Sequence, residues 1–148
     1  MSPDPKNDLL YLLEIIQSAE KIKRYAENFN SADDFWEAND QMNFNAVLTL
    51  LTQIGELSAK VSEFLRQNNP QIPWRTIKNF RNRAVHDYAG LNVFIVFQTI
   101  RESIPELESQ VYTLIQKGLK EKQFDYEEFQ TARKSNYYAW VNFSKISL

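Results

Sequence analysis

The only histidine of this 148-residue chain, His86, stands five residues after an arginine, Arg81. Histidine is the side chain whose ordinary pKa lets it gain or lose a proton near neutral pH. Arginine keeps its charge and presents N–H donors in a geometry that matches phosphate oxygens. A residue that transfers protons, close to a residue that binds phosphate, favours chemistry on a phosphodiester.

The charged residues that precede the histidine in this segment are all basic. No acidic residue intervenes before Asp87, although the whole chain has a net charge of −2. The basic residues are Arg75, Lys78, Arg81 and Arg83. A local excess of positive charge favours an anionic partner such as a nucleic acid.

Five segments, in the same order, resemble one protein family. The stretch from Arg81 to His86, followed by Tyr88, is similar to the R-x4-H-x-Y form of the HEPN motif found in HepT toxins. The other similar segments are residues 8–13, 53–56 (Q-I-G-E), 70–75 (P-Q-I-P-W-R) and 104–107. The resemblance covers about residues 8–111 and leaves residues 120–148 as a C-terminal extension of unknown role.

The resemblance implies an all-α fold, an antiparallel HEPN-like bundle of four to five helices, here followed by an aromatic C-terminal tail. It also implies a homodimer in which two motifs line one cleft, the site of a metal-independent endoribonuclease in active members. In that cleft Arg81 would stabilise charge on the phosphate, and His86 would transfer protons. Cleavage through the ribose 2′-OH needs both a base and an acid, and a symmetric pair of chains supplies two histidines.

The family match extends to substrate contacts and to control. Asn82 would orient the phosphate, and Lys78 and Arg83 would add phosphate contacts; solvated helix positions are the alternative for all three. In HepT-like toxins the motif tyrosine, here Tyr88, receives AMP from a cognate MNT-type nucleotidyltransferase antitoxin. A packed aromatic is the alternative for Tyr88, but Gly90 just after it predicts an accessible turn.

An ideal helix through the motif leaves a plainer interpretation open. At roughly 100° per residue, Arg81 lies about 40° from the core-facing Ile77, so it could form a structural ion pair with Glu56. Arg81 and His86 lie about 140° apart. They cannot reach one substrate atom unless the helix ends or distorts near His86, or a second chain contributes. His86 could also have no role beyond a favourable interaction with the negative end of the helix dipole.

The composition is that of a compact protein, with 43% hydrophobic and 24% charged residues. It predicts a single domain over residues 1–148 with its own core. Cysteine is absent, which excludes disulfides and thiolate metal sites and is typical of a cytoplasmic protein. No stretch approaches the ~18 apolar residues of a membrane span, so no membrane partner is expected. With one histidine and no nucleotide-binding loop, we expect no metal and no cofactor.

Apolar periodicity predicts helices over residues 8–28, 40–67, 74–86, 91–102 and 105–117. Asp8 is expected to cap the first helix, and Pro105 to stand in the first turn of the last. Phe35 and Trp36 should anchor the connection between the first two. Trp74 is expected in the core, with stacking on a base as the alternative. The tail from residue 120 shows no clear period and predicts a helix plus a strand, or an arm packed on a partner.

Two classes of function fit these patterns. The first is an endoribonuclease toxin of a toxin-antitoxin system, neutralised by AMP attachment. The second is a non-catalytic HEPN module that binds nucleotide or RNA, or that scaffolds a nucleotidyltransferase. The motif favours the first class, because a scaffold has no need for both Arg81 and His86.

Overall fold

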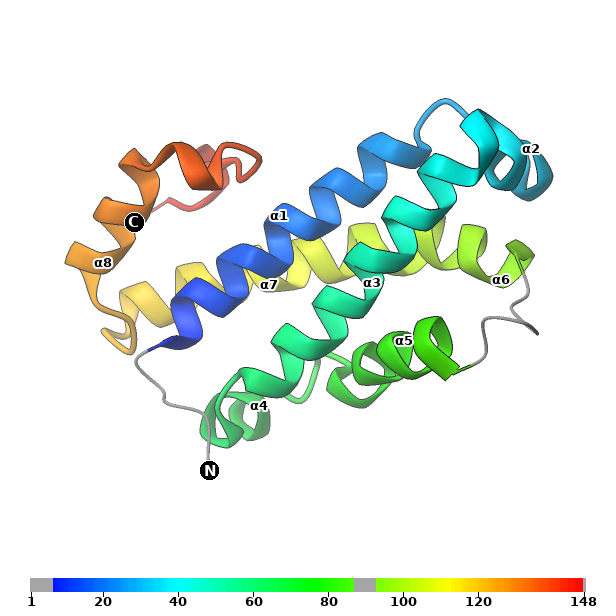
Figure 1. Cartoon of the computed structure of the whole chain (residues 1–148). Coiled ribbons are helices and arrows are strands. Elements are labelled where there is room, and N and C mark those ends of the chain that lie inside the picture. The colour runs from blue at the N-terminus through cyan, green and yellow to red at the C-terminus, as the bar shows by residue number, and fades with distance from the viewer. Residues whose placement is uncertain (1–6, 87–92, 148) are drawn as a thin grey trace.

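The computed structural model of this chain describes the backbone of residues 7–86 and 93–147, and the side chains of residues 7–80 and 93–147. Three long helices dominate it, and α1 (Asp8–Ala26) packs against both α3 (Met42–Lys60) and α7 (Ile104–Lys120). Figure 1 shows that α3 and α7 each run antiparallel to α1. No strand occurs in the part of the chain described, and the predicted all-α antiparallel bundle is confirmed.

The long helices meet through apolar side chains spaced three and four residues apart, the pattern of one helix face. These side chains are almost completely buried. They include Leu12, Ile16, Val47, Ile54, Val111 and Ile115. No helix in the described ranges has the length and apolar content needed to cross a bilayer.

A short helix, α2 (Ala32–Glu37), joins α1 to α3. Phe35 has no exposed surface and contacts the rings of three other phenylalanines, whereas Trp36 is 37% exposed. The expectation of an anchor is therefore confirmed for Phe35 and wrong for Trp36. The next helix begins at Met42 rather than at residue 40, because Asn39, Asp40 and Gln41 have positive φ angles of 52°, 56° and 68°, which an α-helix cannot contain.

The single helix predicted over residues 40–67 is two helices. The break falls at Val61 and Ser62, after which α4 (Glu63–Asn68) begins. Asp8 explains the break: its carboxylate accepts hydrogen bonds from the Ser62 backbone nitrogen (2.8 Å) and hydroxyl (2.5 Å), while Ser62 Oγ accepts from Leu65 N and caps α4. Asp8 therefore joins the start of α1 to α4 instead of capping α1, whose N-cap is Asn7.

The two separate helices predicted after the motif are continuous in the structure. α6 (Val93–Gln98) passes through a π-helical turn (Thr99–Ser103) into α7. Pro105 lies in the first turn of α7, as expected. Proline has no backbone N–H and its ring crowds the preceding turn, and a wide π turn accommodates it without ending the helix.

The C-terminal tail covers one face of α1 and α7 (Figure 1). It contains α8 (Tyr126–Lys134) and two 3₁₀ turns, so the predicted helix is confirmed and the predicted strand is wrong. The amide of buried Gln17 donates to the Tyr137 carbonyl (2.7 Å) and accepts from Trp140 N (3.2 Å). The tail thus packs on the chain's own core, and a contact with a partner stays a prediction.

Candidate active site

The helix that carries the arginine–histidine motif is α5 (Trp74–His86), with the bounds predicted from the sequence. It packs along α3 (Figure 1). Ile77 is 2% exposed, and Phe80 lies partly buried against the same core. These contacts fix how α5 is placed on the bundle, and so fix where the motif segment begins.

The turn before α5 is held by one backbone carbonyl. The Asn69 oxygen accepts from the Ile72 nitrogen (3.2 Å) and from the Trp74 indole Nε1 (3.0 Å). The Asn69 side chain donates to the Leu65 carbonyl at the end of α4 (2.8 Å). Trp74 is half-buried against the core, which supports the core interpretation over base stacking. The P-Q-I-P-W segment therefore sets the first residue of the motif helix.

The structure describes the side chains of some predicted site residues and only the backbone of others. Lys78 has a described side chain, and it is exposed. Arg81, Asn82, Arg83 and His86 belong to α5 by their backbone, but their side chains lie outside the described residues, as does Tyr88 altogether. The structure thus places four of the predicted residues in the final turns of one helix. How their side chains approach a substrate stays a prediction.

The alternative partner for Arg81, Glu56, lies on α3, the helix against which α5 packs. It lines a hollow of about 500 Å³ on the exposed face of α3, together with Gln53 and Lys60. Gln53 and Glu56 of the Q-I-G-E segment therefore face outward on the helix that supports the motif, whereas Ile54 and Gly55 are buried. The structural ion pair between Arg81 and Glu56 stays an open prediction.

A second hollow, of about 400 Å³, opens beside the first turns of α5 and is termed the α4–α5 groove. It lies against the end of α3, and the side chains that line it from α4 and α5 are Glu63, Arg66, Gln67, Trp74, Arg75 and Lys78. The sequence indicated the basic residues of α5 but not Arg66, because the break between α3 and α4 that brings it there was not predicted.

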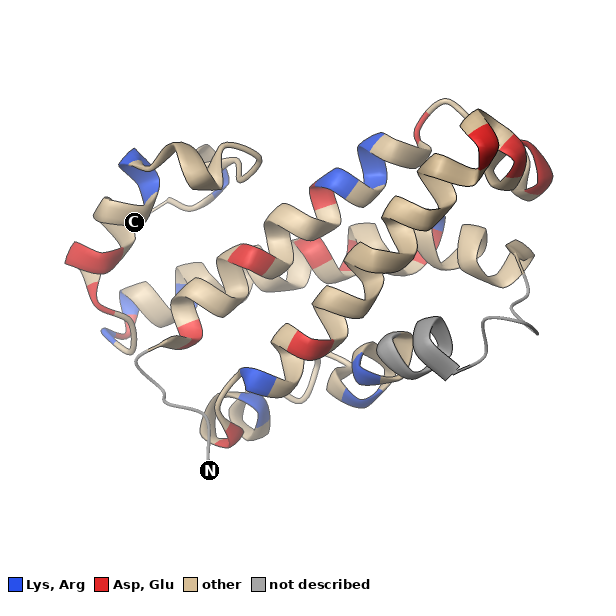
Figure 2. Ribbon diagram, in the orientation of Figure 1, with Lys and Arg blue, Asp and Glu red and all other residues tan. Residues whose placement is uncertain are grey.

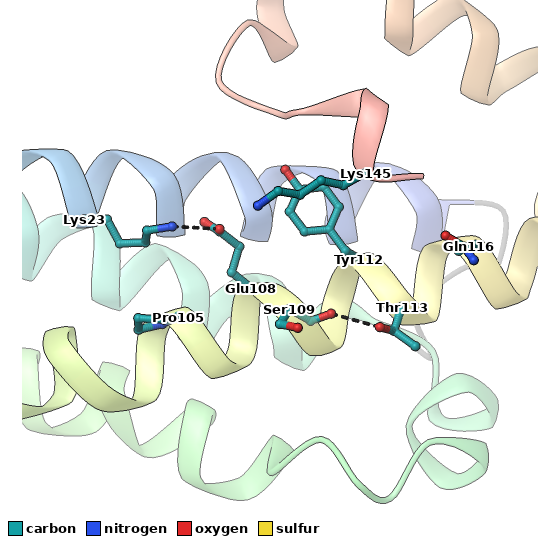
Figure 3. Close-up of a pocket in the computed structure, with 8 residues that line it drawn as sticks. All are labelled: Lys23, Pro105, Glu108, Ser109, Tyr112, Thr113, Gln116 and Lys145. Carbon is teal, nitrogen blue, oxygen red and sulfur yellow. Dashed lines mark hydrogen bonds and ion pairs between the residues drawn. The ribbon is translucent and has the colours of Figure 1, made fainter. Parts of the chain in front are cut away.

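A polar cluster between α1 and α7, drawn in Figure 3, was also missed. Lys23 Nζ lies 2.9 Å from Glu108 Oε1 and 3.2 Å from Glu20 Oε2. Burial, followed by the proximity of Glu20, raises the pKa of Glu108, which is 4% exposed. Burial also pushes the pKa of Glu20 upward, but bonds from Glu108 and Lys23 outweigh it and lower that pKa. One signal was available: Glu108 interrupts the apolar face of α7.

The hollow at this cluster measures about 390 Å³ and is bordered by the C-terminal tail. Tyr112 Oη accepts a hydrogen bond from Asn142 N (2.8 Å), and Lys145 Nζ lies 5.3 Å from the centre of the Tyr112 ring. Burial raises the pKa of Tyr112. These groups fasten the tail to α7, which is a structural role. Among the described residues, no group of three or more histidine, aspartate or glutamate side chains could hold a metal ion.

Comparison with protein families gives a match that is described as "Ribonuclease HepT-like" and covers residues 15–114. The matched range contains all of α3, α4 and α5, and hence the arginine–histidine motif, the hollow on α3 and the α4–α5 groove. It ends within α7 and does not include the C-terminal tail.

Curated proteins give further matches. The chain is 33% identical to "Putative RNase TTE0752" of Caldanaerobacter subterraneus subsp. tengcongensis, over 72% of this chain and 93% of that protein. It is 30% identical to "Putative RNase MJ0125" of Methanocaldococcus jannaschii, over 80% of this chain and 99% of that protein. It is 29% identical to "Probable ribonuclease HepT" of Thermococcus cleftensis, over 68% and 88%. No solved structure gives a significant match.

Proposed function

The chain belongs to the HepT-like ribonuclease family, and from this premise we propose that it is a metal-independent endoribonuclease acting as the toxin of a toxin-antitoxin system. The observation that carries the proposal is the position of Arg81 and His86 in the last two turns of α5, a helix fixed on α3 within the matched range. A ribonuclease of this kind needs a cation for the phosphate and a group that moves protons, and this helix end supplies both residue types.

The proposed reaction uses the substrate's own 2′-OH. Its oxygen attacks the adjacent phosphorus and loses its proton to a base, while the bond from phosphorus to the 5′ oxygen breaks and that oxygen takes a proton from an acid. The products are a 2′,3′-cyclic phosphate and a free 5′-OH. His86 is the proton-transfer group, and Arg81 stabilises the extra charge on the phosphorus centre. Asn82, Lys78 and Arg83 contribute contacts to the phosphates.

Two protons move in this reaction, and each chain has one histidine. A homodimer with two-fold symmetry brings two copies of the motif to one cleft, so that one His86 is the base while the other is the acid. Pairing also answers the geometric objection that Arg81 and His86 lie about 140° apart on one ideal helix. The family resemblance supports the same arrangement.

The substrate requirement is tested with chemically matched strands in the presence of EDTA. We expect the protein to cleave RNA and to leave a 2′,3′-cyclic phosphate. A DNA strand of the same sequence, and an RNA with a 2′-O-methyl group at the cut site, should stay intact because they lack the nucleophile. Cleavage of the methylated strand at that position would contradict the mechanism.

Control of the toxin is proposed to act through Tyr88, two residues after His86. AMP attached there would place a phosphate and a bulky nucleoside beside the site that holds substrate phosphate, and the attached phosphate could pair with Arg81. The partner is an MNT-type nucleotidyltransferase. Coexpression should add AMP mass to the peptide that contains Tyr88, while Tyr88→Phe should escape modification and keep its nuclease activity. An adduct on Tyr112 instead would overturn the assignment.

A further inference from the structure

We infer that the α4–α5 groove binds backbone phosphates of the substrate RNA a few nucleotides away from the bond that is cut. This inference rests on the proposed function, because it assigns the groove to the same RNA strand. It adds Arg66 and Arg75 to the substrate-binding residues and gives Lys78 a defined place among them.

The groove carries an excess of positive charge that the protein leaves largely uncompensated. Arg66, Arg75 and Lys78 line it, and in the described part of the chain no carboxylate lies within ion-pair distance of any of them. The groove has one acidic wall residue, Glu63, whose Oε1 accepts a hydrogen bond from Gln67 Nε2 (3.0 Å). Figure 2 shows lysine and arginine positions gathered where α3 ends and α4 and α5 begin. Such a concentration of one charge attracts anions.

Arg66 provides the most specific indication. Its Nε is buried and has no hydrogen-bond acceptor among the described residues. Buried donors in folded proteins are nearly always paired, and a guanidinium presents its donors in a fork that fits two phosphate oxygens. Arg66 also lines the groove, so a phosphate there would offer acceptors to the other donors of this guanidinium.

The end of α5 that borders the groove adds to the positive potential. Arg75 lies in the first turn, which contains no acidic residue. The positive charge of Arg75 is repelled by the positive end of the helix dipole. An anion at this position is attracted both by the helix dipole and by Arg75. Trp74 forms an apolar wall beside these cations and is held by its bond to the Asn69 carbonyl.

The same helix connects the groove to the motif. At about 1.5 Å of rise per residue, Lys78 precedes His86 by about 12 Å and Arg75 precedes it by about 16 Å. At about 3.4 Å per nucleotide of a stacked strand, these distances correspond to about three to five nucleotides. A strand that follows α5 from the motif therefore reaches the groove with phosphates that are not the one being cleaved.

Binding is tested with a 2′-O-methyl strand of about 16 nucleotides, the upper end of the usual site size, which cannot be cut. Its affinity is measured by fluorescence anisotropy over a series of salt concentrations for the wild type, Arg66→Gln and Arg75→Gln. Each variant should bind several-fold more weakly, with a log–log salt slope smaller by about 0.7, the value for one phosphate contact on a single strand. Lys120→Gln, an exposed site at the far end of α7, should change neither quantity.

Cleavage assays distinguish a failure of the groove assignment from a failure of the proposed ribonuclease function. With the 16-nucleotide RNA, which spans the groove by the register above, Arg75→Gln should lower kcat/KM. With a dinucleotide, which is too short to reach it, the variant should match the wild type. If the wild type cuts no RNA, the proposed function fails and the anisotropy series alone decides the groove. If both groove variants equal the wild type in salt slope, and Arg75→Gln equals it in cleavage of the long RNA, the groove assignment is wrong while the ribonuclease stands. Arg75 is exposed, so its variant is expected to fold, as circular dichroism would verify.

Discussion

The buried carboxyl group of Glu108 shows how single residues hold this bundle together. Its Oε1 accepts from Lys23, and its Oε2 is buried with no donor among the described residues. The raised pKa of Glu108 and the lowered pKa of Glu20 fit a proton held on Glu108 and shared with Glu20. A buried acid that keeps its proton avoids the cost of a second buried charge.

The raised pKa of Glu108 makes the contribution of this residue to folding stability depend on pH. Below its ordinary value of 4.5, the folded and unfolded chains both hold this proton. Above 4.5, and up to the raised pKa, only the folded chain does, so the stability that Glu108 contributes is lost as pH rises through the folded pKa. Glu20, whose pKa is lowered, acts in the opposite direction and loses its contribution as pH falls.

Glu108→Gln removes the ionisation and keeps the shape of the side chain. Its free energy of unfolding, measured by urea denaturation and compared with the wild type, should improve as pH rises from about 4.5 to about 7. Glu106→Gln, at an exposed site in the first turn of the same helix, is the matched control. Parallel pH curves for Glu108→Gln and the wild type would rule out the proton-sharing account.

Residues could be singled out from the sequence where rarity and spacing coincide, as they do for Arg81 and His86. The roles of Asp8, Gln17 and Glu108 could not be predicted, although Glu108 does interrupt the apolar face of α7, because each acts through a contact with a distant segment: Ser62, the Tyr137–Trp140 turn and Lys23. A single sequence has no local signal for such partners. Asp8 even carried a misleading one, because an acidic residue at a helix start usually indicates a cap.

The contact between α7 and the start of the tail depends on a residue without a side chain, Gly118. The ring of Phe124 lies so close to Gly118 that a Cβ at position 118 would overlap it. The backbone nitrogens of Gln123 and Phe124 also donate to the Gly118 carbonyl (2.8 and 3.3 Å). Glycine here serves close packing at the point where the chain turns away from α7.

Gly118→Ala tests this contact. Alanine in a helix is ordinarily favoured over glycine by about 0.5–1 kcal/mol, but forcing extra atoms into a packed core costs about 1–3 kcal/mol. We expect a net loss, measured as a lower urea midpoint by circular dichroism. Lys117→Ala, an exposed neighbour, should change stability by less than about 0.5 kcal/mol. A Gly118→Ala protein more stable than the wild type would show that Phe124 yields easily.

The existence and type of the main helices followed from apolar period, because long amphipathic segments have few alternatives. α5 matched at both ends, since a proline-bounded turn marks its start. The errors lie where tertiary contacts override local pattern: Asp8 ends α3 early by binding Ser62, and a π turn carries the chain past Pro105. The tail carried no period because its aromatic residues lie on one short helix and on irregular turns, where they also contact one another, as Phe129 and Phe143 do.

The proposed reaction requires two chains of this protein. A dimer in which one His86 is the base and the other the acid makes a prediction that a self-sufficient chain does not. A heterodimer of one wild-type chain and one His86→Ala chain, isolated through two different affinity tags, should be nearly as inactive as the doubly substituted dimer. A heterodimer of one wild-type chain and one Lys134→Ala chain is the control for effects of the affinity tags and of the exchange of chains between dimers. Half the wild-type activity in the first heterodimer would refute the shared cleft.

The central claim is that Arg81 and His86 at the end of α5 carry RNA cleavage. The most direct test is the single-turnover rate of RNA cleavage in EDTA for the wild type, Arg81→Ala and His86→Ala, with Lys134→Ala as a surface control. We expect metal-independent cleavage by the wild type and the control, and a loss of about 10²-fold or more in each motif variant, as for a residue in acid–base catalysis. Undiminished cleavage by folded His86→Ala would contradict this claim.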